Sequence, residues 1–170
     1  MVDQIVTYIV DFLPDWLPGE LITFIVSVFP VLECRGGMFA AKLCGVDSPI
    51  IAFIVCYLGN ILPIPFILIF IRQIFAFMKK HNILTKLVEK LETKTLAKRD
   101  KIDRIGPWGL LTFVAIPLPG TGGWTGSLLA ALLDLKFSKA FPVIAVGVLI
   151  ADFIMAAGVY GITGLLSFLS

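Results

Sequence analysis

The apolar stretch from Gly106 to Asp134 most constrains the fold, because prolines and glycines interrupt it at its middle. The interrupting residues are Pro117, Pro119, Gly120, Gly122 and Gly123. Proline lacks a backbone N–H and obstructs the preceding helical turn, whereas glycine lets the chain turn sharply. The stretch therefore predicts two half-helices that meet at a break. Irregular backbone at membrane depth is tolerated only where protein or a water-filled cavity satisfies it, so we expect an internal polar site there.

The composition places this stretch in a membrane protein. Of the 170 residues, 58% are hydrophobic and 15% are charged, which is too apolar for a soluble domain. A membrane-spanning helix needs about 20 apolar residues. The chain can therefore make at most a few full crossings beside shorter segments. We expect a single membrane domain over residues 1–170.

The polar residues do not suggest an enzyme. The sequence contains no recognisable nucleotide loop, catalytic triad or metal cluster. Cys34, Cys44 and Cys56 lie in apolar surroundings without a C-x-x-C spacing, so we expect no zinc site and no disulfide framework. We expect no cofactor, no bound metal and no nucleic-acid partner.

The chain divides into segments by apolar runs and helix breakers. We expect an interfacial amphipathic helix over 1–19, a first broken hairpin over 20–47, a transmembrane helix over 48–72, an amphipathic helical segment over 73–105, a second broken hairpin over 106–135 and a final transmembrane helix over 136–170. Ser48 and Pro49 are expected to open the first transmembrane helix, and Pro63 and Pro65 to kink it.

The two halves of the sequence resemble each other. Residues 29–37 match residues 116–123 within one residue. Each match lies between two apolar arms and is followed by a long span with a glycine at its middle, Gly59 or Gly147. Two repeats of broken hairpin plus span describe the chain economically.

Charge predicts the topology. Ten of the 14 basic residues lie between Arg72 and Arg104, which places that segment in the cytoplasm by the positive-inside rule. Lys136 and Lys139 stay on the same side only if the second hairpin enters and leaves from the cytoplasm. The first hairpin then enters from outside. We therefore favour an all-α integral protein of the cell (inner) membrane with two inverted repeats, re-entrant hairpins and both termini outside; full crossings are the alternative.

Glu33 and Arg35 lie inside the first hairpin, where an ionisable side chain costs about 2.5–3.5 kcal/mol. They could form a mutual salt bridge whose role is only structural, at the break in the helix. Two residues apart, however, they point to different sides of a helix but to the same side of a strand. Either the backbone is unwound there or each has its own partner. The guanidinium of Arg35 would suit an anionic ligand.

The glycine pairs suggest where a ligand would bind. We expect Gly36-Gly37 and Gly122-Gly123 each to begin a half-helix, with Thr121 as a helix N-cap. Two positive helix ends would then point into the membrane centre and attract an anion. A purely structural break is the alternative.

Two further polar residues lie in the spans. Asp152 is either a buried acid bonded to a neighbouring helix or a proton carrier, a role for which Glu33 is the better candidate because Arg35 lies beside it. Asn60 would bond the broken segments or a neighbouring helix. The candidate substrate and proton site comprises Glu33, Arg35, Gly36, Gly37, Asn60, Pro117, Pro119, Gly120, Thr121, Gly122, Gly123 and Asp152.

The motif of residues 33–37, followed by residues 113–122, resembles the family of putative small multidrug export proteins, which is related to the DedA/VTT superfamily of membrane transporters and scramblases. The resemblance implies two re-entrant hairpins, an acid and an arginine in the first, and proton-coupled transport. In the DedA branch the implied substrate is a lipid phosphate such as undecaprenyl phosphate. The second arginine that DedA proteins usually carry near the later proline motif is absent from Gly120-Thr121-Gly122.

Several functions remain in competition. The leading hypothesis is a proton-linked transporter or flippase for an anionic amphiphile such as a polyprenyl or other lipid phosphate. An exporter of small cationic drugs would need an unpaired acid, such as Glu33 or Asp152, facing a cavity. A non-transporting membrane-organising protein and an intramembrane lipid enzyme are alternatives of other classes. The expected partners are membrane lipids and a small anionic or amphiphilic substrate, and a homodimer is left open.

Overall fold

The computed structural model describes residues 2–14, 16–81, 89, 93, 107–118, 120–133 and 135–166. These residues fold into helices, and the described part of the chain contains no strand. The helices are α1 (Val2–Phe12), α2 (Gly19–Val28), α3 (Glu33–Leu43), α4 (Pro49–Ile61), α5 (Pro63–Lys80), α8 (Pro107–Ala115), α9 (Gly123–Leu132) and α10 (Phe137–Leu166). The all-helical class expected from the sequence is confirmed.

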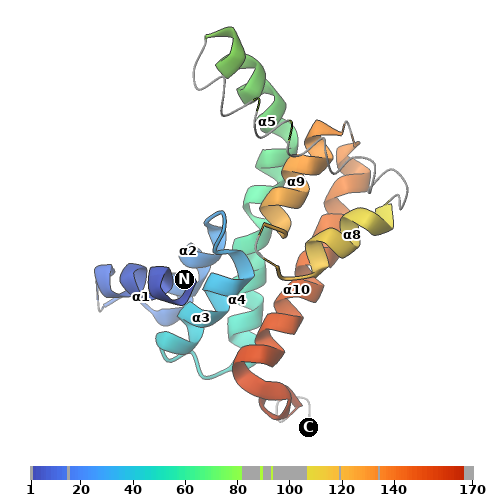
Figure 1. The fold of residues 1–170 in the computed structure, drawn as a ribbon. Helices are drawn as coiled ribbons and strands as arrows, with labels where there is room; N and C mark the ends of the chain where they lie inside the picture. The colour runs from blue at the N-terminus through green and yellow to red at the C-terminus, as the bar shows by residue number, and fades with distance from the viewer. Residues whose placement is uncertain are drawn as a thin grey trace.

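Among the described residues, two stretches are long and apolar enough to cross a membrane by length and composition. They are Pro49–Ile71, formed by α4 and the start of α5, and Phe137–Gly161 in α10. The predicted start at Ser48 is confirmed, because its Oγ accepts the Ile51 N–H at 3.4 Å. Leu62 joins α4 to α5 directly before Pro63, in the kinked region predicted from the prolines. Figure 1 shows α5 continuing the line of α4.

The two predicted breaks are present. Residues 29–32 separate α2 from α3, and residues 116–122 separate α8 from α9. The second break uses glycine where φ is positive, at Gly120 (φ 83°) and Gly122 (φ 124°). The first places Val31 (φ 78°) and Glu33 (φ 45°) in the left-handed region. Side-chain-bearing residues adopt this region at a cost, and such strain gathers at functional sites.

The two halves of the chain pack in equivalent ways. The first arm of each hairpin lies against the long helix that follows it, α2 against α4 and α8 against α10. The second arm lies against the long helix of the other half, α3 against α10 and α9 against α5. The helices α4 and α10 pack on each other between the hairpins (Figure 1).

Close contacts at glycine repeat this equivalence. Ser27 of α2 lies between Gly37 and Gly59, and a Cβ added at Gly59 would lie 2.7 Å from the Ser27 Cβ. Val114 of α8 lies between Gly126 and Gly147, and a Cβ at Gly147 would lie 2.8 Å from the Val114 Cβ. The mid-span glycines that defined the repeat in the sequence are therefore the places where each first arm meets its long helix.

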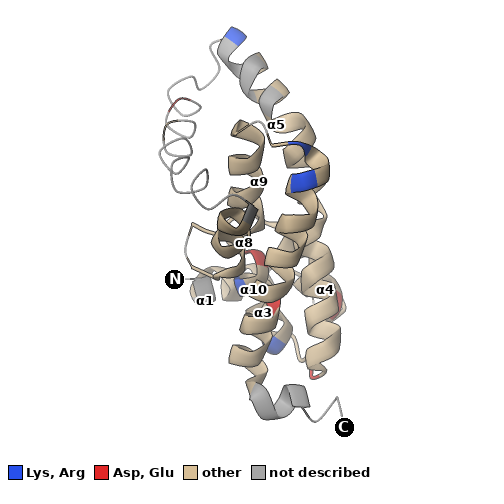
Figure 2. Ribbon diagram, turned by 90° about the vertical axis from the view of Figure 1, so that its right-hand side faces the viewer, with Lys and Arg blue, Asp and Glu red and all other residues tan. Residues whose placement is uncertain are grey.

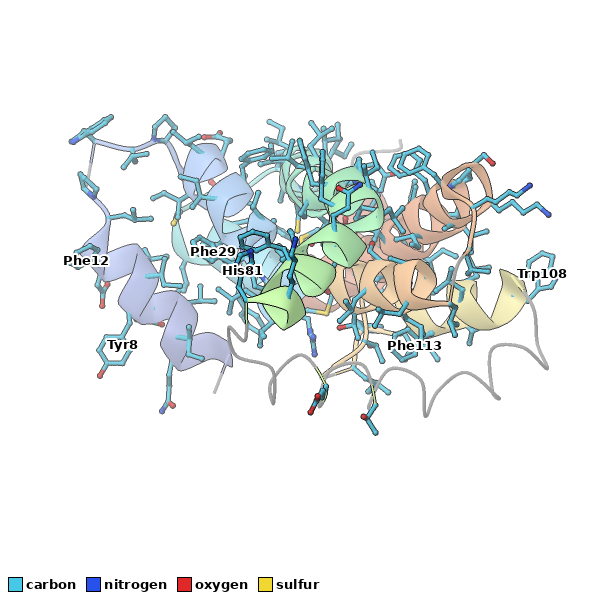
Figure 3. The ribbon with its side chains drawn as sticks, turned by 90° about the horizontal axis from the view of Figure 1, so that it is seen from above. Tyr8, Phe12, Phe29, His81, Trp108 and Phe113 are labelled. Atoms are coloured by element: carbon cyan, nitrogen blue, oxygen red, sulfur yellow. The ribbon has the colours of Figure 1, made fainter. Side chains whose placement is uncertain are left out.

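The N-terminal segment forms the predicted amphipathic helix. Helix α1 packs against α3 through Val6, which is fully buried in a cluster with Ile22 and Val26. Tyr8 and Phe12 are exposed and point away from the body of the protein (Figure 3). The side chain of Phe12 thus lies outside the packed interface.

The segment predicted over 73–105 begins inside a helix. Helix α5 runs on to Lys80, so the expected boundary after residue 72 is not a helix end. Beyond His81, only Glu89 and Thr93 of this predicted segment lie within the described residues. Charged residues are sparse along the described helices (Figure 2), as the membrane assignment requires.

Candidate functional site

The carboxylate of Glu33 caps a helix of the other hairpin. Glu33 begins α3 and is only 4% exposed. Its Oε1 accepts the Trp124 N–H at 3.1 Å, and the N–H of Gly123 also interacts with the carboxylate. These amides belong to the first turn of α9, whose positive end favours a negative charge. A helix therefore begins at the second break, as predicted, and the protein's own carboxylate occupies its N-terminus.

Gly122 allows this approach. It is the N-cap residue of α9, and its φ of 124° with ψ of −171° suits glycine almost alone. A Cβ added at Gly122 would collide with Glu33 Oε2 and lie 2.7 Å from Glu33 Cδ. Gly122 is therefore required both by its backbone conformation and by the carboxylate beside it.

Trp124 joins the two breaks and was not among the predicted site residues. Its indole Nε1 donates to the carbonyl oxygen of Val28 at 3.0 Å, while its backbone N–H donates to Glu33. Val28 ends α2, where carbonyls lack partners within the helix. One residue of the second hairpin thus holds both sides of the first break. A tryptophan directly after the Gly122-Gly123 pair was the available sequence signal.

Arg35 has an unmatched donor. Its Nε is buried and has no hydrogen-bond partner among the described residues. No ion pair between Glu33 and Arg35 is present in this part of the structure, so the salt bridge weighed from the sequence is not observed. Both residues lie in α3, where a spacing of two directs them to different sides. Both predicted options apply to Glu33: its backbone leaves the helical region at φ 45°, and its carboxylate has a separate partner in the Trp124 N–H.

Thr121 does not cap α9, which corrects the prediction. Its Oγ1 lies 2.6 Å from the Ile116 carbonyl oxygen and 2.8 Å from that of Leu118, and it accepts the Leu118 N–H at 3.0 Å. The hydroxyl therefore closes the turn of the second break. The N-cap position falls one residue later, at Gly122.

Gly36-Gly37 does not begin a half-helix either. Helix α3 begins at Glu33, and the Gly36 N–H already donates to the Leu32 carbonyl at 2.8 Å. The pair lies inside α3 and serves close packing: a Cβ at Gly37 would lie 2.7 Å from Cys56 Sγ. Only the second glycine pair marks a helix start, because α9 begins at Gly123.

A small cavity lies where the breaks meet. Its lining residues are Glu33, Cys34, Arg35, Asn60, Val114, Pro117, Thr121, Gly122, Gly123, Val148 and Ala151. Its volume of about 10 Å³ has room for about one water molecule. Most of the predicted site residues thus come together from both hairpins and from α4, and α10 adds Val148 and Ala151. Gly36, Gly37, Gly120 and Asp152 do not line the cavity, and Pro119 lies outside the described residues.

Asp152 lies behind Asn60. It is fully buried, and its Oδ1 accepts a hydrogen bond from the Asn60 Nδ2 at 3.1 Å. Its Oδ2 is buried without a partner in the described structure. Cys56 Sγ lies 3.8 Å from Asp152 Oδ1 and 3.2 Å from Ser27 Oγ. Asn60 of α4 thus bonds a neighbouring helix, and Asp152 is a buried acid on α10 with one hydrogen-bonded and one unpartnered oxygen.

Metal binding has no support in the described residues. They contain no group of three or more His, Cys, Asp or Glu side chains placed to hold a metal ion. Cys34, Cys44 and Cys56 are free thiols.

Apolar helices of spanning length around a buried polar site define an all-helical membrane protein. A family model described as putative small multi-drug export protein matches residues 33–154. This match covers more than half of the chain, and the chain belongs to that family. No curated protein and no solved structure matches the chain. The wider relation to the DedA/VTT superfamily stays a prediction from the resemblance.

Proposed function

We propose that this protein is a proton-linked membrane transporter that moves an anionic amphiphile, such as a lipid phosphate, through the site between its two hairpins. One observation carries the proposal: the Glu33 carboxylate lies on the N-terminus of α9, in a cavity that Arg35 also lines. Helix N-termini and guanidinium groups are the protein groups that bind phosphates best. A site for an anion is thus built, with an internal carboxylate in the ligand's place.

The proposed architecture is a pair of inverted repeats with re-entrant hairpins. The helices α2, α3, α8 and α9 have 9 to 11 residues. At about 1.5 Å per residue each is about 15 Å long, half of a bilayer core of about 30 Å. The start of α10, beside Lys136 and Lys139, lies at the same end of the molecule as the far end of α5 (Figure 1). The positive-inside rule then assigns both to the cytoplasm.

Glu33 links anion binding to protons in this proposal. A substrate anion that reaches α9 must displace the Glu33 carboxylate from the Trp124 N–H. Two negative charges would then share one apolar site, which is unfavourable unless the protein takes up a proton. Anion entry with proton uptake is the expected coupling.

The conformation described is closed. The cavity of about 10 Å³ is far too small for an amphiphile. Trp124 bonds both Val28 and Glu33, so the hairpins must separate at Trp124 before a ligand enters. The Trp124 contacts are therefore the proposed gate.

A second candidate is an exporter of small cationic drugs. The description of the family, small multi-drug export, favours it, and so does the unpartnered Oδ2 of Asp152. A buried carboxylate could bind a cation that enters from the cavity. The two candidates differ in the charge of the substrate.

The test is flux through the purified protein in liposomes. Radiolabelled farnesyl phosphate is the anionic probe and ethidium the cationic one. We expect a pH difference to drive farnesyl phosphate uptake, and Glu33→Gln and Arg35→Lys each to abolish it, because lysine cannot form a bidentate fork and the glutamine amide has no charge to exchange. Ethidium flux without farnesyl phosphate flux would select the second candidate. Wild-type flux in both variants would refute the proposed site.

A further inference from the structure

The buried cluster around Asp152 is separate from the α9 end and is not explained by anion binding. Asp152 lies on α10, and its contacts come from Asn60 and Cys56 of α4 and from the Cys34 thiol of α3. Its two oxygens differ: Oδ1 has donors, whereas Oδ2 is buried with no partner in the described structure. A buried carboxylate oxygen without a donor is strongly unfavourable unless the group binds a positive charge.

The groups that face Asp152 supply no such charge. The ionisable side chains that act on it are Cys34 and Glu33 of α3 and Cys56 of α4, none of them basic. The helices α8 and α9 carry no titratable residue. On α3, Lys42 lies over the ring of Tyr160 instead. Arg35, the other basic residue of α3, lines the cavity beside Asn60, but its Nε has no partner and it forms no ion pair with Asp152 in the described structure. The basic residues of α5 begin at Arg72, beyond the apolar span.

The cluster suits a proton better than a metal cation. Hard cations take several oxygen ligands, whereas the neighbours of Asp152 Oδ1 are an amide NH₂ and a thiol. The nearby oxygens of Ser27 and Cys34 surround Cys56 Sγ, at 3.2 and 3.6 Å, and this sulfur fills the space between them. A proton bound to Oδ2 needs no set of surrounding oxygen ligands.

We infer that Asp152 is the proton-binding residue of the transport cycle and that Asn60 is the positioning residue that links it to the anion site. This inference rests on the proposed function. Asn60 lines the cavity with Glu33 and Arg35 and also donates to Asp152. An anion entering the cavity would therefore act on Asp152 through Asn60. In this step a hydronium ion gives its proton to Oδ2, which forms an O–H bond and leaves a water molecule; the O–H bond later breaks when the proton passes back to water.

Glu33 is then the internal competitor of the substrate rather than the proton carrier. Its carboxylate accepts the first amides of α9, contacts that a protonated carboxyl would weaken. The two buried acids would therefore have different roles. Glu33 keeps the anion site closed when no substrate is bound, and Asp152 carries the proton. This assignment reverses the preference for Glu33 that the sequence suggested.

The experiment measures the ratio of farnesyl phosphate uptake with and without a pH difference across liposomes. We expect a ratio above one for the wild type and a ratio of one for Asp152→Asn, whatever its absolute rate. Tyr160→Phe is the matched control: it removes another polar contact of α10, the hydroxyl that donates to the Val46 carbonyl at 2.7 Å, and should keep the wild-type ratio. A wild-type ratio in Asp152→Asn, or uptake driven by a sodium gradient instead, would overturn the inference.

Infrared spectroscopy of the same proteins in lipid gives a second readout that does not depend on transport. The carbonyl band of a buried protonated carboxyl should be present in the wild type and in Glu33→Gln, and should be lost in Asp152→Asn. Persistence of the band in Asp152→Asn would overturn the inference even if no variant transports. Absence of farnesyl phosphate uptake in the wild type, with the band lost as expected in Asp152→Asn, would refute the proposed function alone.

Discussion

Replacing Gly122 by alanine tests the contact on which the site depends. The substitution forces a Cβ into the conformation at φ 124°, at a cost of about 1–3 kcal/mol. The new Cβ also displaces Glu33 from the Trp124 N–H, and a hydrogen bond to a charged group contributes about 1.5–3 kcal/mol. We expect the free energy of unfolding to fall by the sum, about 2.5–6 kcal/mol.

Gly120 is the matched control. It also has a positive φ, 83°, but a Cβ there would meet nothing within 4 Å. Gly120→Ala should therefore lose only the backbone part, about 1–3 kcal/mol. The assay is equilibrium unfolding in mixed micelles, followed by circular dichroism.

A double-mutant cycle isolates the contribution of the Glu33 carboxylate to the cost of Gly122→Ala. In a Glu33→Ala background the Cβ of Gly122→Ala has no carboxylate to displace, so its cost should fall to that of Gly120→Ala. Equal costs for the two glycine substitutions in the wild-type background would refute the reasoning. So would a Gly122→Ala cost that does not change when Glu33 is replaced.

Three further predictions follow from the same contacts. Thr121→Val should lower the free energy of unfolding by about 1 kcal/mol, because it removes the hydroxyl that closes the turn at Leu118. The affinity for farnesyl phosphate should stay unchanged. A tenfold loss of affinity would instead support Thr121 as a ligand-binding helix cap. Trp124→Phe removes only the indole bond to Val28, so Cys34, which lines the cavity, should react faster with a membrane-permeant thiol reagent, as mass spectrometry would report; an unchanged rate would exclude the gate. Reporter fusions should place residue 170 outside and residues 73–105 in the cytoplasm, and a cytoplasmic reporter at residue 170 would rule out the re-entrant topology.

The local features of the fold were predictable from the sequence because they depend on neighbouring residues. Pro30 marks the first break, proline and glycine together mark the second, and Ser48 marks the start of α4. The mid-span glycines Gly59 and Gly147 were found as a repeat, and the structure gives their physical role in close helix packing. Composition alone defined the membrane class.

The contacts between the hairpins were not predictable, since they arise only when distant segments dock. Glu33 and Trp124 are 91 positions apart, and nothing local indicates that one caps the helix of the other. The pattern of Thr121 before Gly122-Gly123 suggested a hydroxyl cap, but the positive φ of Gly122 moves the cap to the glycine. Likewise, the start of α3 at Glu33 requires a left-handed residue with a side chain, which propensity argues against.

The central claim is that Glu33 occupies the place of a substrate anion, and the affinity of the purified protein for farnesyl phosphate tests it most directly. Calorimetric titration would compare the wild type with Glu33→Gln and Arg35→Lys. Glutamine keeps the shape of the side chain and removes one like charge from the site, so the account predicts roughly tenfold tighter binding to Glu33→Gln, equivalent to about 1.4 kcal/mol. It predicts weaker binding to Arg35→Lys. Equal affinity of the wild type and Glu33→Gln would contradict the claim.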